Sequence, residues 1–385
     1  MDVTALMQDP AVAKALAWVE AHTGKVIEEA IRICEIPSPT FEEGERAAYV
    51  KDRFARLGLA DVTIDGAGNV RGRRPGAGGG PGVAVGAHLD TVFPKGTDVR
   101  VKRDGSRLLA PGIGDNSVAV ASLLAMVEAL DAGGVRTAGD LYLTCNTGEE
   151  GLGDLKGMKA FVEDVKDKVE ALVALEGMKI NRIIHVAVGS RRYKVTFTAR
   201  GGHSWGHFPA PSAIHIMGRA IADISRLEVP SDPKTTYNVG VVHGGTTVNT
   251  IASEADMLID MRSVDITSLA DLERRVLGII ERAAKQGDGH AKLDIVGDRP
   301  AGSIPATHPV VEACKAVHRA LGLQTFTEAS STDLNAALGV GLPGVCISIT
   351  EGANEHRLDE YIETGPIPTG VKNILLATVA LAGTA

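Results

Sequence analysis

The stretch Val83-Ala84-Val85-Gly86-Ala87-His88-Leu89-Asp90 joins a short apolar run to two polar side chains at its end. An uninterrupted apolar run of this length, bounded by turn residues, is typical of a strand buried on both faces. Strands and helices alternate after it, with a helical pattern over 116–131, a strand over 141–145, a helix over 157–165 and a strand over 171–175. This alternation predicts a largely parallel central sheet flanked by helices.

The segments before this strand show helical patterns. Residues 11–36 and 42–57 both have the apolar spacing of helices, and prolines separate them. Thr40 and Glu43 fit a capping box for the second helix, in which the threonine accepts from backbone N–H groups and the glutamate reaches back.

The pattern changes near residue 190. Polar and apolar residues alternate in three stretches, 192–198, 236–242 and 255–261, and helical patterns occur at 212–226 and 269–285. The alternation favours an antiparallel sheet with one face covered by the helices. A buried-strand pattern returns at 344–349. We therefore expect an α/β fold with a discontinuous metal-binding catalytic domain, 1–189 and 303–385, and an inserted α+β domain at 190–302 with an antiparallel sheet.

Composition excludes several classes of partner. The net charge is −8 and there is no run of five basic residues, which argues against nucleic acid as a partner. No apolar stretch reaches the roughly 18 residues of a membrane span, so we expect no membrane association. The start has no basic leader or apolar core, which favours a cytoplasmic location. The four cysteines are scattered, and we interpret them as reduced core thiols.

Polar residues that bind metals gather at or near the ends of the predicted strands, where open α/β sheets place their ligands. These are His88, Asp90, Asp115, Glu149, Glu150, Glu176 and His356. Singly, each has another explanation: Asp115 precedes a helix and could be an N-cap, and His88 with Asp90 could be an exposed pair. Histidine and carboxylate ligands without cysteine suit catalytic zinc, manganese or cobalt.

Five such ligands exceed what one tetrahedral ion uses, whereas two ions that share a carboxylate would use them all. A further acid could then be the general base for water. Asp90, two residues after His88, is placed to accept from the second ring nitrogen of that histidine.

Five motifs in this order resemble the co-catalytic dizinc peptidase family, which includes glutamate carboxypeptidase, succinyl-diaminopimelate desuccinylase, acetylornithine deacetylase and aminoacylase. They are His-Leu-Asp-Thr-Val (88–92), Gly-Asp-Asn (114–116), Gly-Glu-Glu-Gly (148–151), Gly-Gly-His-Ser (201–204) and His-Arg-Leu-Asp-Glu-Tyr (356–361). The resemblance spans essentially the whole chain. It implies two divalent metal ions, zinc being favoured over cobalt or manganese, held by His88, Asp115, Glu150, Glu176 and His356.

The resemblance also assigns roles around the metals. It implies that Asp115 bridges the ions, that Glu149 is the general base, that Asp90 orients His88, and that the Asp115–Asn116 peptide is cis. The inserted domain resembles a lid that also forms a homodimer, so His203 would stabilise the oxyanion in a partner's active site. Asn249 and Arg262 match positions that bind a substrate carboxylate, although Arg262 could instead close a structural ion pair.

The expected activity is hydrolysis of an amide bond in a small peptide, with N-acyl amino acid deacylation as the alternative within the same chemistry. A metal-binding relative without turnover is the non-enzymatic alternative, and the complete ligand set with Glu149 argues against it. A serine hydrolase is disfavoured, because Gly202-His203-Ser204-Trp205-Gly206 is followed by prolines rather than by the required helix. The sequence leaves Arg191, Arg192, Trp205 and Arg357 without a firm role. Packing is the default for Trp205, and exposed strand positions rather than the substrate path are the default for Arg191 and Arg192. Glu355 and Arg357 either alter the pocket or pair with each other.

Overall fold

The computed structural model describes residues 3–385, and the chain forms two compact units. The main unit comprises the chain up to Ala187 together with Ser303–Ala385, and the inserted unit comprises Val188–Gly302. Each has a hydrophobic core of its own. The combination of a largely parallel sheet with a separate antiparallel sheet confirms the predicted fold class.

Within the described residues, the main unit is built on a nine-stranded sheet, and its order places the chemistry. The strands follow in the order β1 (Ala60–Ile64), β2 (Val70–Arg74), β6 (Leu141–Asn146), β3 (Val83–His88), β7 (Ala171–Met178), β17 (Gly344–Thr350), β8 (Arg182–Ala187) and β15 (Gly302–Ser303), with β16 (Phe326–Ser330) also paired to β8. The four central strands β6, β3, β7 and β17 are mutually parallel. Strand β2 pairs antiparallel with β6, and β8 pairs antiparallel with β17 but parallel with β16. All six residues of β3 are buried, as its apolar run requires.

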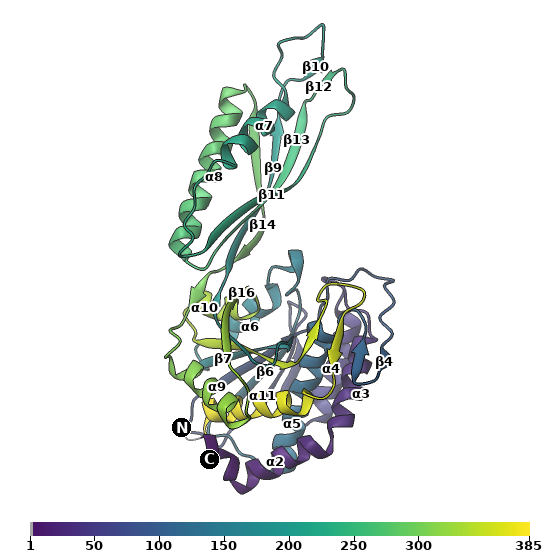
Figure 1. The fold of residues 1–385 in the computed structure, drawn as a ribbon, viewed down its shortest axis with the longest axis vertical. Coiled ribbons are helices and arrows are strands. Elements are labelled where there is room, and N and C mark those ends of the chain that lie inside the picture. The colour runs from purple at the N-terminus through teal and green to yellow at the C-terminus, as the bar shows by residue number, and fades with distance from the viewer. Residues whose placement is uncertain (1–2) are drawn as a thin grey trace. The chain divides into compact units, whose positions relative to one another are not determined.

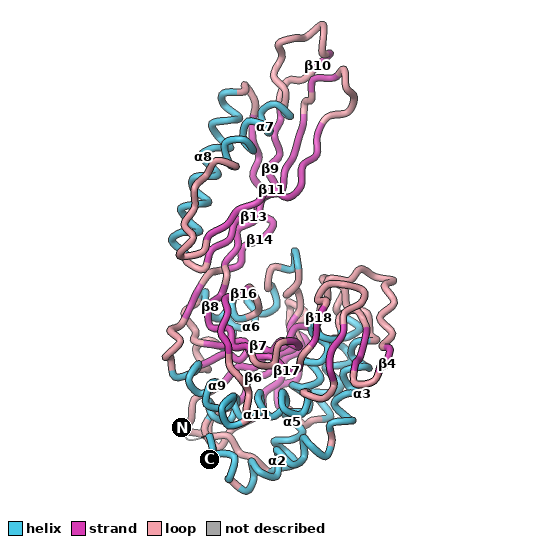
Figure 2. The backbone as a smooth tube through the Cα atoms, viewed as in Figure 1, coloured by secondary structure: helices cyan, strands magenta, loops and turns pink. Residues whose placement is uncertain are grey.

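Helices cover both faces of this sheet (Figure 2). Val83 and Val85 point to a core shared with α1 (Val3–Gln8), α2 (Pro10–Ala21), α3 (Thr23–Cys34), α4 (Gly44–Arg56), α5 (Val118–Gly133), α9 (Pro309–Ala320) and α11 (Ile367–Ala382). Ala84 points to the opposite core, which is shared with α6 (Lys156–Val165) and α10 (Leu334–Gly339). Residues 113–133 are long and apolar enough to span a membrane, but 94% of the apolar window is buried, as in the core helix of a sheet.

A second, small antiparallel sheet belongs to the main unit and was not predicted. Its order is β18 (Gly352–Ala353), β19 (Tyr361–Glu363), β5 (Arg107–Leu109) and β4 (Lys102–Asp104). Strands of two or three residues are too short to show an alternating pattern. This sheet matters because residues 354–360 form the loop between β18 and β19, and the chain after β5 leads directly to Asp115.

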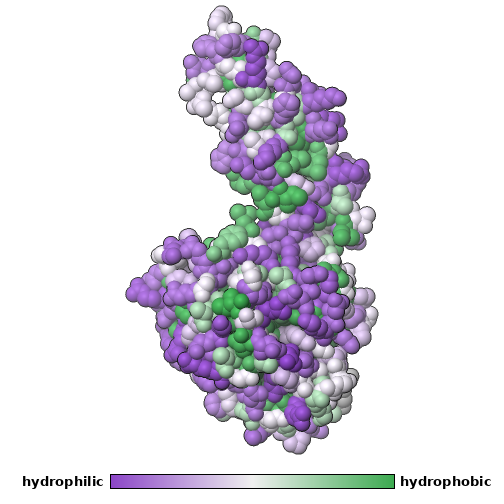
Figure 3. Space-filling model, turned by 180° about the vertical axis from the view of Figure 1, so that it is seen from behind, coloured by the Kyte–Doolittle hydropathy of each residue, from purple (hydrophilic) through white to green (hydrophobic). Residues whose placement is uncertain are grey.

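The inserted unit is a four-stranded antiparallel sheet with two helices on one face (Figure 1). The strand order is β11 (Thr235–Gly244), β13 (Glu254–Ser263), β9 (Gly189–Thr198) and β14 (His290–Arg299), and the helices are α7 (Ala213–Ile224) and α8 (Ile266–Gln286). A short ribbon pairs β10 (Gly202–His203) with β12 (Thr250–Ile251). Val241 and Leu258 pair across the face away from the helices and remain exposed, and Figure 3 shows hydrophobic surface on this unit.

Two local predictions were wrong. The helix expected over 11–36 is two helices separated at His22, where Thr23 and Gly24 have low helix propensity. The capping box expected at Thr40 is absent, because the N-cap of α4 is Glu43 and it makes no side-chain cap hydrogen bond. The Thr40 hydroxyl donates instead to Oδ2 of Asp90 at 3.0 Å, so a tertiary partner replaces the local one.

Candidate metal centre

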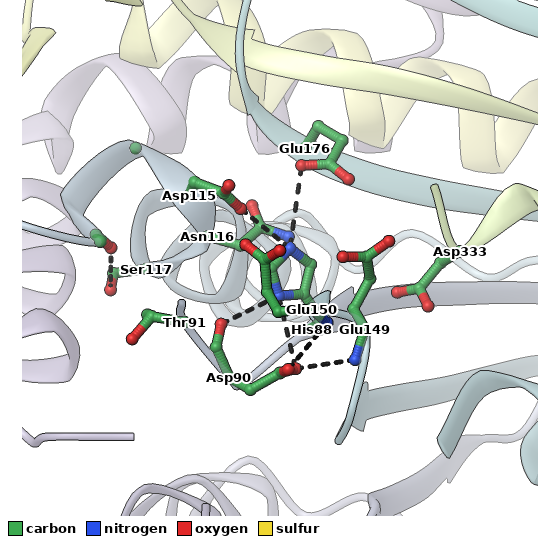
Figure 4. A network of polar contacts seen from close by, with 12 residues as sticks. His88, Asp90, Thr91, Asp115, Asn116, Ser117, Glu149, Glu150, Glu176 and Asp333 are labelled. Atoms are coloured by element: carbon green, nitrogen blue, oxygen red, sulfur yellow. Dashed lines mark hydrogen bonds and ion pairs between the residues drawn. The ribbon is translucent and has the colours of Figure 1, made fainter. Parts of the chain in front are cut away.

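Three neighbouring parallel strands deliver the first set of predicted ligands to one edge of the main sheet. His88 is the last residue of β3, Glu149 and Glu150 follow β6, and Glu176 lies near the end of β7. Because β6, β3 and β7 are adjacent and parallel, their carboxyl ends lie together. Figure 4 shows the side chains of His88, Glu150 and Glu176 directed toward Asp115.

Asp115 reaches this edge because its loop lies directly on β7. A Cβ atom added at Gly177 would come within 1.7 Å of the carbonyl oxygen of Gly114, so only glycine permits the approach. The Asn116 amide donates to the carbonyl of Leu175 at 2.8 Å and fastens the loop to the same strand. The peptide bond between Asp115 and Asn116 is cis, as the resemblance implies.

The last predicted ligand arrives from the small sheet. His356 lies in the loop between β18 and β19, and its side chain is 53% exposed. Its Nε2 atom lies 3.0 Å from Oδ2 of Asp115 and 3.1 Å from Oε1 of Glu150.

Two triads therefore share one carboxylate. His88, Asp115 and Glu176 form the first group, and Asp115, Glu150 and His356 form the second. In the first, Nε2 of His88 lies 3.0 Å from Oδ1 of Asp115 and 3.9 Å from Oε2 of Glu176. Ligand atoms around a tetrahedral zinc ion lie roughly 3.3–3.6 Å apart, so both groups have the size of a metal site.

The protonation of His88 supports this reading. Its Nδ1 atom lies 3.0 Å from the backbone carbonyl oxygen of Asp90, which can only accept, so Nδ1 carries a hydrogen. Burial would lower the pKa of His88, but its hydrogen bonds to Asp115, Asp90 and Glu176 raise it well above 6.5. The contact between Nε2 and the Asp115 carboxylate therefore favours a cation, either a proton or a metal ion. The sequence predicted the Asp90 carboxylate as the partner of Nδ1, but that oxygen is 3.7 Å away and the carbonyl is closer.

The pKa values report the same electrostatics. Burial would raise the pKa of Asp115, but His356 and His88 hold it well below its usual range. Burial and the neighbouring Asp115 charge raise the pKa of Glu150 to about 7. Hydrogen bonds to Asp115 and Glu150 raise the pKa of His356 to about 11. Carboxylates crowded in this way favour bound cations, either protons or metal ions.

A layer of hydrogen bonds behind the ligands holds the loop of Glu149 and Glu150. The Asp90 carboxylate is buried and accepts from the backbone N–H groups of Glu149 at 3.0 Å and Glu150 at 2.9 Å. Glu43, also buried, accepts from the Gly148 N–H at 3.1 Å. Three consecutive N–H groups are thus bound by carboxylates. Glu43 and Thr40 were missed in these roles because the local pattern resembled a helix cap.

A buried acid beside this loop was also missed. Asp333 is 2% exposed, accepts from the Asn146 amide at 2.8 Å, and lies beside the site in Figure 4. Burial raises its pKa to about 7. The only signal in the sequence is the polar run Ser331-Thr332-Asp333 before a buried helix, which by itself is typical of helix starts.

The inserted unit carries the remaining predicted residues. His203 in β10 pairs with Thr250, and the Ser204 N–H donates to the Asn249 carbonyl at 3.0 Å, so His203 and Asn249 are brought together. Nδ1 of His203 accepts from the N–H groups of Trp205 and Gly206, each at 3.2 Å. The hydrogen of the neutral ring is therefore on Nε2. Arg262 lies apart from this ribbon, on β13, and its Nε pairs with Asp260 at 2.7 Å.

The residues without an assigned role are placed as follows. Arg191 pairs with Asp298 and Arg192 with Asp260, and both arginines are only partly exposed. Trp205 is 89% exposed, so the expected packing role is wrong within this chain. Arg357 pairs with Asp359 at 2.8 Å rather than with Glu355, because the side chain two residues later is within reach.

The fold agrees with comparisons to known proteins. Residues 84–379 match the peptidase family M20/M25/M40. The chain belongs to this family. As a member of M20 it is a hydrolase of the peptidase and deacylase group. Among its relatives, a succinyl-diaminopimelate desuccinylase of Nitrosospira multiformis is 25% identical over 290 residues, which are 69% of this chain and 72% of the relative.

Solved structures of the M20 fold superpose on nearly the whole chain. Aminopeptidase PepT from Bacillus cereus gives a TM-score of 0.79 at 22% identity, covering 94% of this chain and 99% of the other. The YXEP protein of Bacillus subtilis, described as a dinuclear metal-binding peptidase, gives a TM-score of 0.71 at 17% identity, covering 94% and 99%. At these identities the likeness shows the fold alone.

Proposed function

We propose that this M20 protein hydrolyses an amide bond of a small peptide with two divalent metal ions. The observation that carries the proposal is the sharing of Asp115 by two triads, each with one histidine and one further carboxylate. A single structural ion would not need this arrangement, because one tetrahedral ion is satisfied by four ligands.

The donor atoms fit such ions. Both triads offer imidazole nitrogen and carboxylate oxygen without sulfur, and the four cysteines are buried elsewhere in the structure. This donor set suits zinc, cobalt or manganese, and we propose zinc. His88, Asp115 and Glu176 would hold one ion, and Asp115, Glu150 and His356 the other.

Glu149 is the proposed general base. When bound, the metal ions would acidify water and polarise the substrate carbonyl. The Glu149 carboxylate would take up the proton of the attacking water and pass it to the leaving amine. Its backbone is held by Asp90 next to the ligand Glu150, and it is 6% exposed, which supports a fixed position close to the ions.

The inserted unit would complete the site from a second subunit. We propose a homodimer in which the exposed His203 donates its Nε2 hydrogen to the developing oxyanion of a partner's substrate. Asn249, next to His203, and Arg262 would bind the substrate carboxylate. Arg262 is already paired with Asp260, so its guanidinium is oriented before substrate arrives.

A second candidate is deacylation of an N-acyl amino acid, which the name of the desuccinylase relative favours. The attack on the carbonyl would be the same, and only the acyl and amine groups would differ. The choice between the two depends on the pocket around the metals rather than on the metal ligands.

The test is release of primary amine by the zinc-loaded protein from dipeptides, tripeptides and N-acyl amino acids, with Glu149→Ala as the blank. We expect release from one substrate group and a loss of about 10²–10⁴-fold in the blank, whose zinc content should be unchanged. Equal rates in the two proteins would refute the role of Glu149. No release by a protein that binds two zinc ions would favour a binding protein without turnover.

A further inference from the structure

Glu360 is a buried acid that the proposed reaction does not use. It lies in the His-Arg-Leu-Asp-Glu-Tyr motif four residues after His356, and its side chain is 0% exposed. Its carboxylate accepts three backbone hydrogen bonds from the loop that carries Asp115. Oε1 accepts from Gly114 at 2.8 Å and Asp115 at 3.0 Å, and Oε2 accepts from Gly112 at 3.1 Å.

The small sheet explains how Glu360 reaches this loop. Glu360 immediately precedes β19, and β19 pairs with β5, with Tyr361 opposite Leu109. The ladder extends by one bond, in which the Ala110 N–H donates to the Glu360 carbonyl at 3.1 Å. The segment with His356 and the segment with Asp115 therefore leave the same pair of strands at the same end.

We propose that Glu360 is a positioning residue for the metal centre, which fixes the Asp115 loop relative to the His356 loop. It would touch neither metal nor substrate. The three hydrogen bonds that its carboxylate accepts fix the backbone around Asp115. Its own backbone belongs to the loop that carries His356, a ligand of the second triad. Asp115 serves both triads, so a displaced loop would weaken both metal sites together. The inference rests on the two-metal function proposed above.

An alternative is that Glu360 only stabilises the fold. A buried carboxylate with three N–H partners contributes to stability in any protein, so loss of activity or of stability in a variant would not separate the two roles. The distinguishing quantity is the dissociation constant for zinc in the folded variant. A purely structural residue would lower the melting temperature of the metal-free protein and leave that constant unchanged.

Two substitutions probe the contact in different ways. Glu360→Gln keeps the size of the side chain, but its amide has one acceptor oxygen and would turn N–H toward N–H at one of the three donors. Glu360→Asp keeps the charge and is one methylene shorter, so it cannot span all three, and it carries the test if the glutamine variant does not fold. Glu363→Gln is the matched control, because Glu363 lies three residues later, in β19, and binds Arg107 and Ser106 rather than the Asp115 loop.

The experiment is zinc titration of each metal-free, full-length protein in competition with a chromophoric chelator, together with its melting temperature. We expect wild type and Glu363→Gln to bind two zinc ions alike, and both Glu360 variants to bind both ions about 10–100-fold more weakly. Unchanged zinc affinity in the Glu360 variants with a lower melting temperature would overturn the inference while leaving the two-metal proposal intact. Fewer than two zinc ions on wild type would instead overturn the two-metal proposal and this inference with it.

Discussion

Asp115 and His356 are separated by 241 residues in the chain, yet Nε2 of His356 lies 3.0 Å from Oδ2 of Asp115. The other oxygen of the same carboxylate lies 3.0 Å from Nε2 of His88. One side chain thus faces two histidines from opposite sides, and its loss has consequences that the loss of any other ligand does not.

Asp115→Ala should abolish binding of both metal ions. Each triad loses a ligand, and the negative charge that serves both proposed ions is removed. Glu150→Ala is the comparison, since Glu150 belongs to one triad only. After gel filtration, elemental analysis should find about two ions on wild type, about one on Glu150→Ala and close to none on Asp115→Ala. Retention of one ion by Asp115→Ala would contradict the sharing.

Asp90→Asn should lower kcat/KM by about 10–100-fold, as is typical when a partner behind the ligands is changed. The Asp90 carboxylate accepts from two backbone N–H groups, and an asparagine amide would oppose one of them. Thr40→Val removes one other donor to the same carboxylate and should have a much smaller effect. Steady-state kinetics of the two variants would check this, and equal losses would argue against the backbone contacts.

Gly177→Ala should destabilise the main unit, since the added methyl group would lie 1.7 Å from the Gly114 carbonyl oxygen. Overpacking of this kind costs about 1–3 kcal/mol of unfolding free energy, and the displaced loop would also release metal. Gly365→Ala is the control, because nothing lies within 4 Å of its added Cβ. Urea unfolding of the metal-free variants measures the difference, which should be near zero for the control.

Acid should destabilise the fold through His318, far in sequence from the ligands. This side chain is 0% exposed, and burial lowers its pKa from 6.5 to about 4. A lowered folded pKa means that the unfolded chain binds the proton more tightly, so stability is complete above pH 6.5 and is lost as pH falls toward 4. At pH 5 the loss is about 2 kcal/mol.

His318→Gln, which cannot take up the proton, should show a loss about 2 kcal/mol smaller than wild type between pH 7.5 and pH 5. Glutamine can still bind Thr325 and Asn373, the polar neighbours of the histidine. Urea unfolding at the two pH values provides the measurement. Identical pH dependence in the two proteins would show that His318 is not the group responsible.

The sequence predicted those parts of the site that a repeating pattern specifies. Strand ends gave His88, Glu150 and Glu176, because an apolar run followed by an acid or histidine is visible without any tertiary information. The sharing of Asp115 by two triads matches what the ligand count required. The metal-binding roles themselves stay predictions until the ions are measured.

Contacts set by tertiary structure could not be read from local patterns. Thr40 fits a capping box, in which its hydroxyl would accept from backbone N–H groups of the helix. In the structure this hydroxyl instead donates to the buried carboxylate of Asp90. The role of Glu360 depends on β5 and β19. Each of these strands has only three residues, too few to show an alternating pattern of polar and apolar side chains. Trp205 is apolar, and a rule that places such residues in a core does not identify the apolar side chains that stay exposed.

The polypeptide leaves the main unit after Ala187 and returns at Ser303, and these points are neighbours, since the Ile304 N–H donates to the His185 carbonyl at 3.1 Å. An insertion whose two ends lie close together is accommodated without rearrangement of the domain that carries it. Exchange of residues 188–301 by recombination would therefore leave every strand of the nine-stranded sheet in place. Because the main unit has a hydrophobic core of its own, we expect substrate preference among related proteins to change through the inserted unit, with the proposed metal centre left intact.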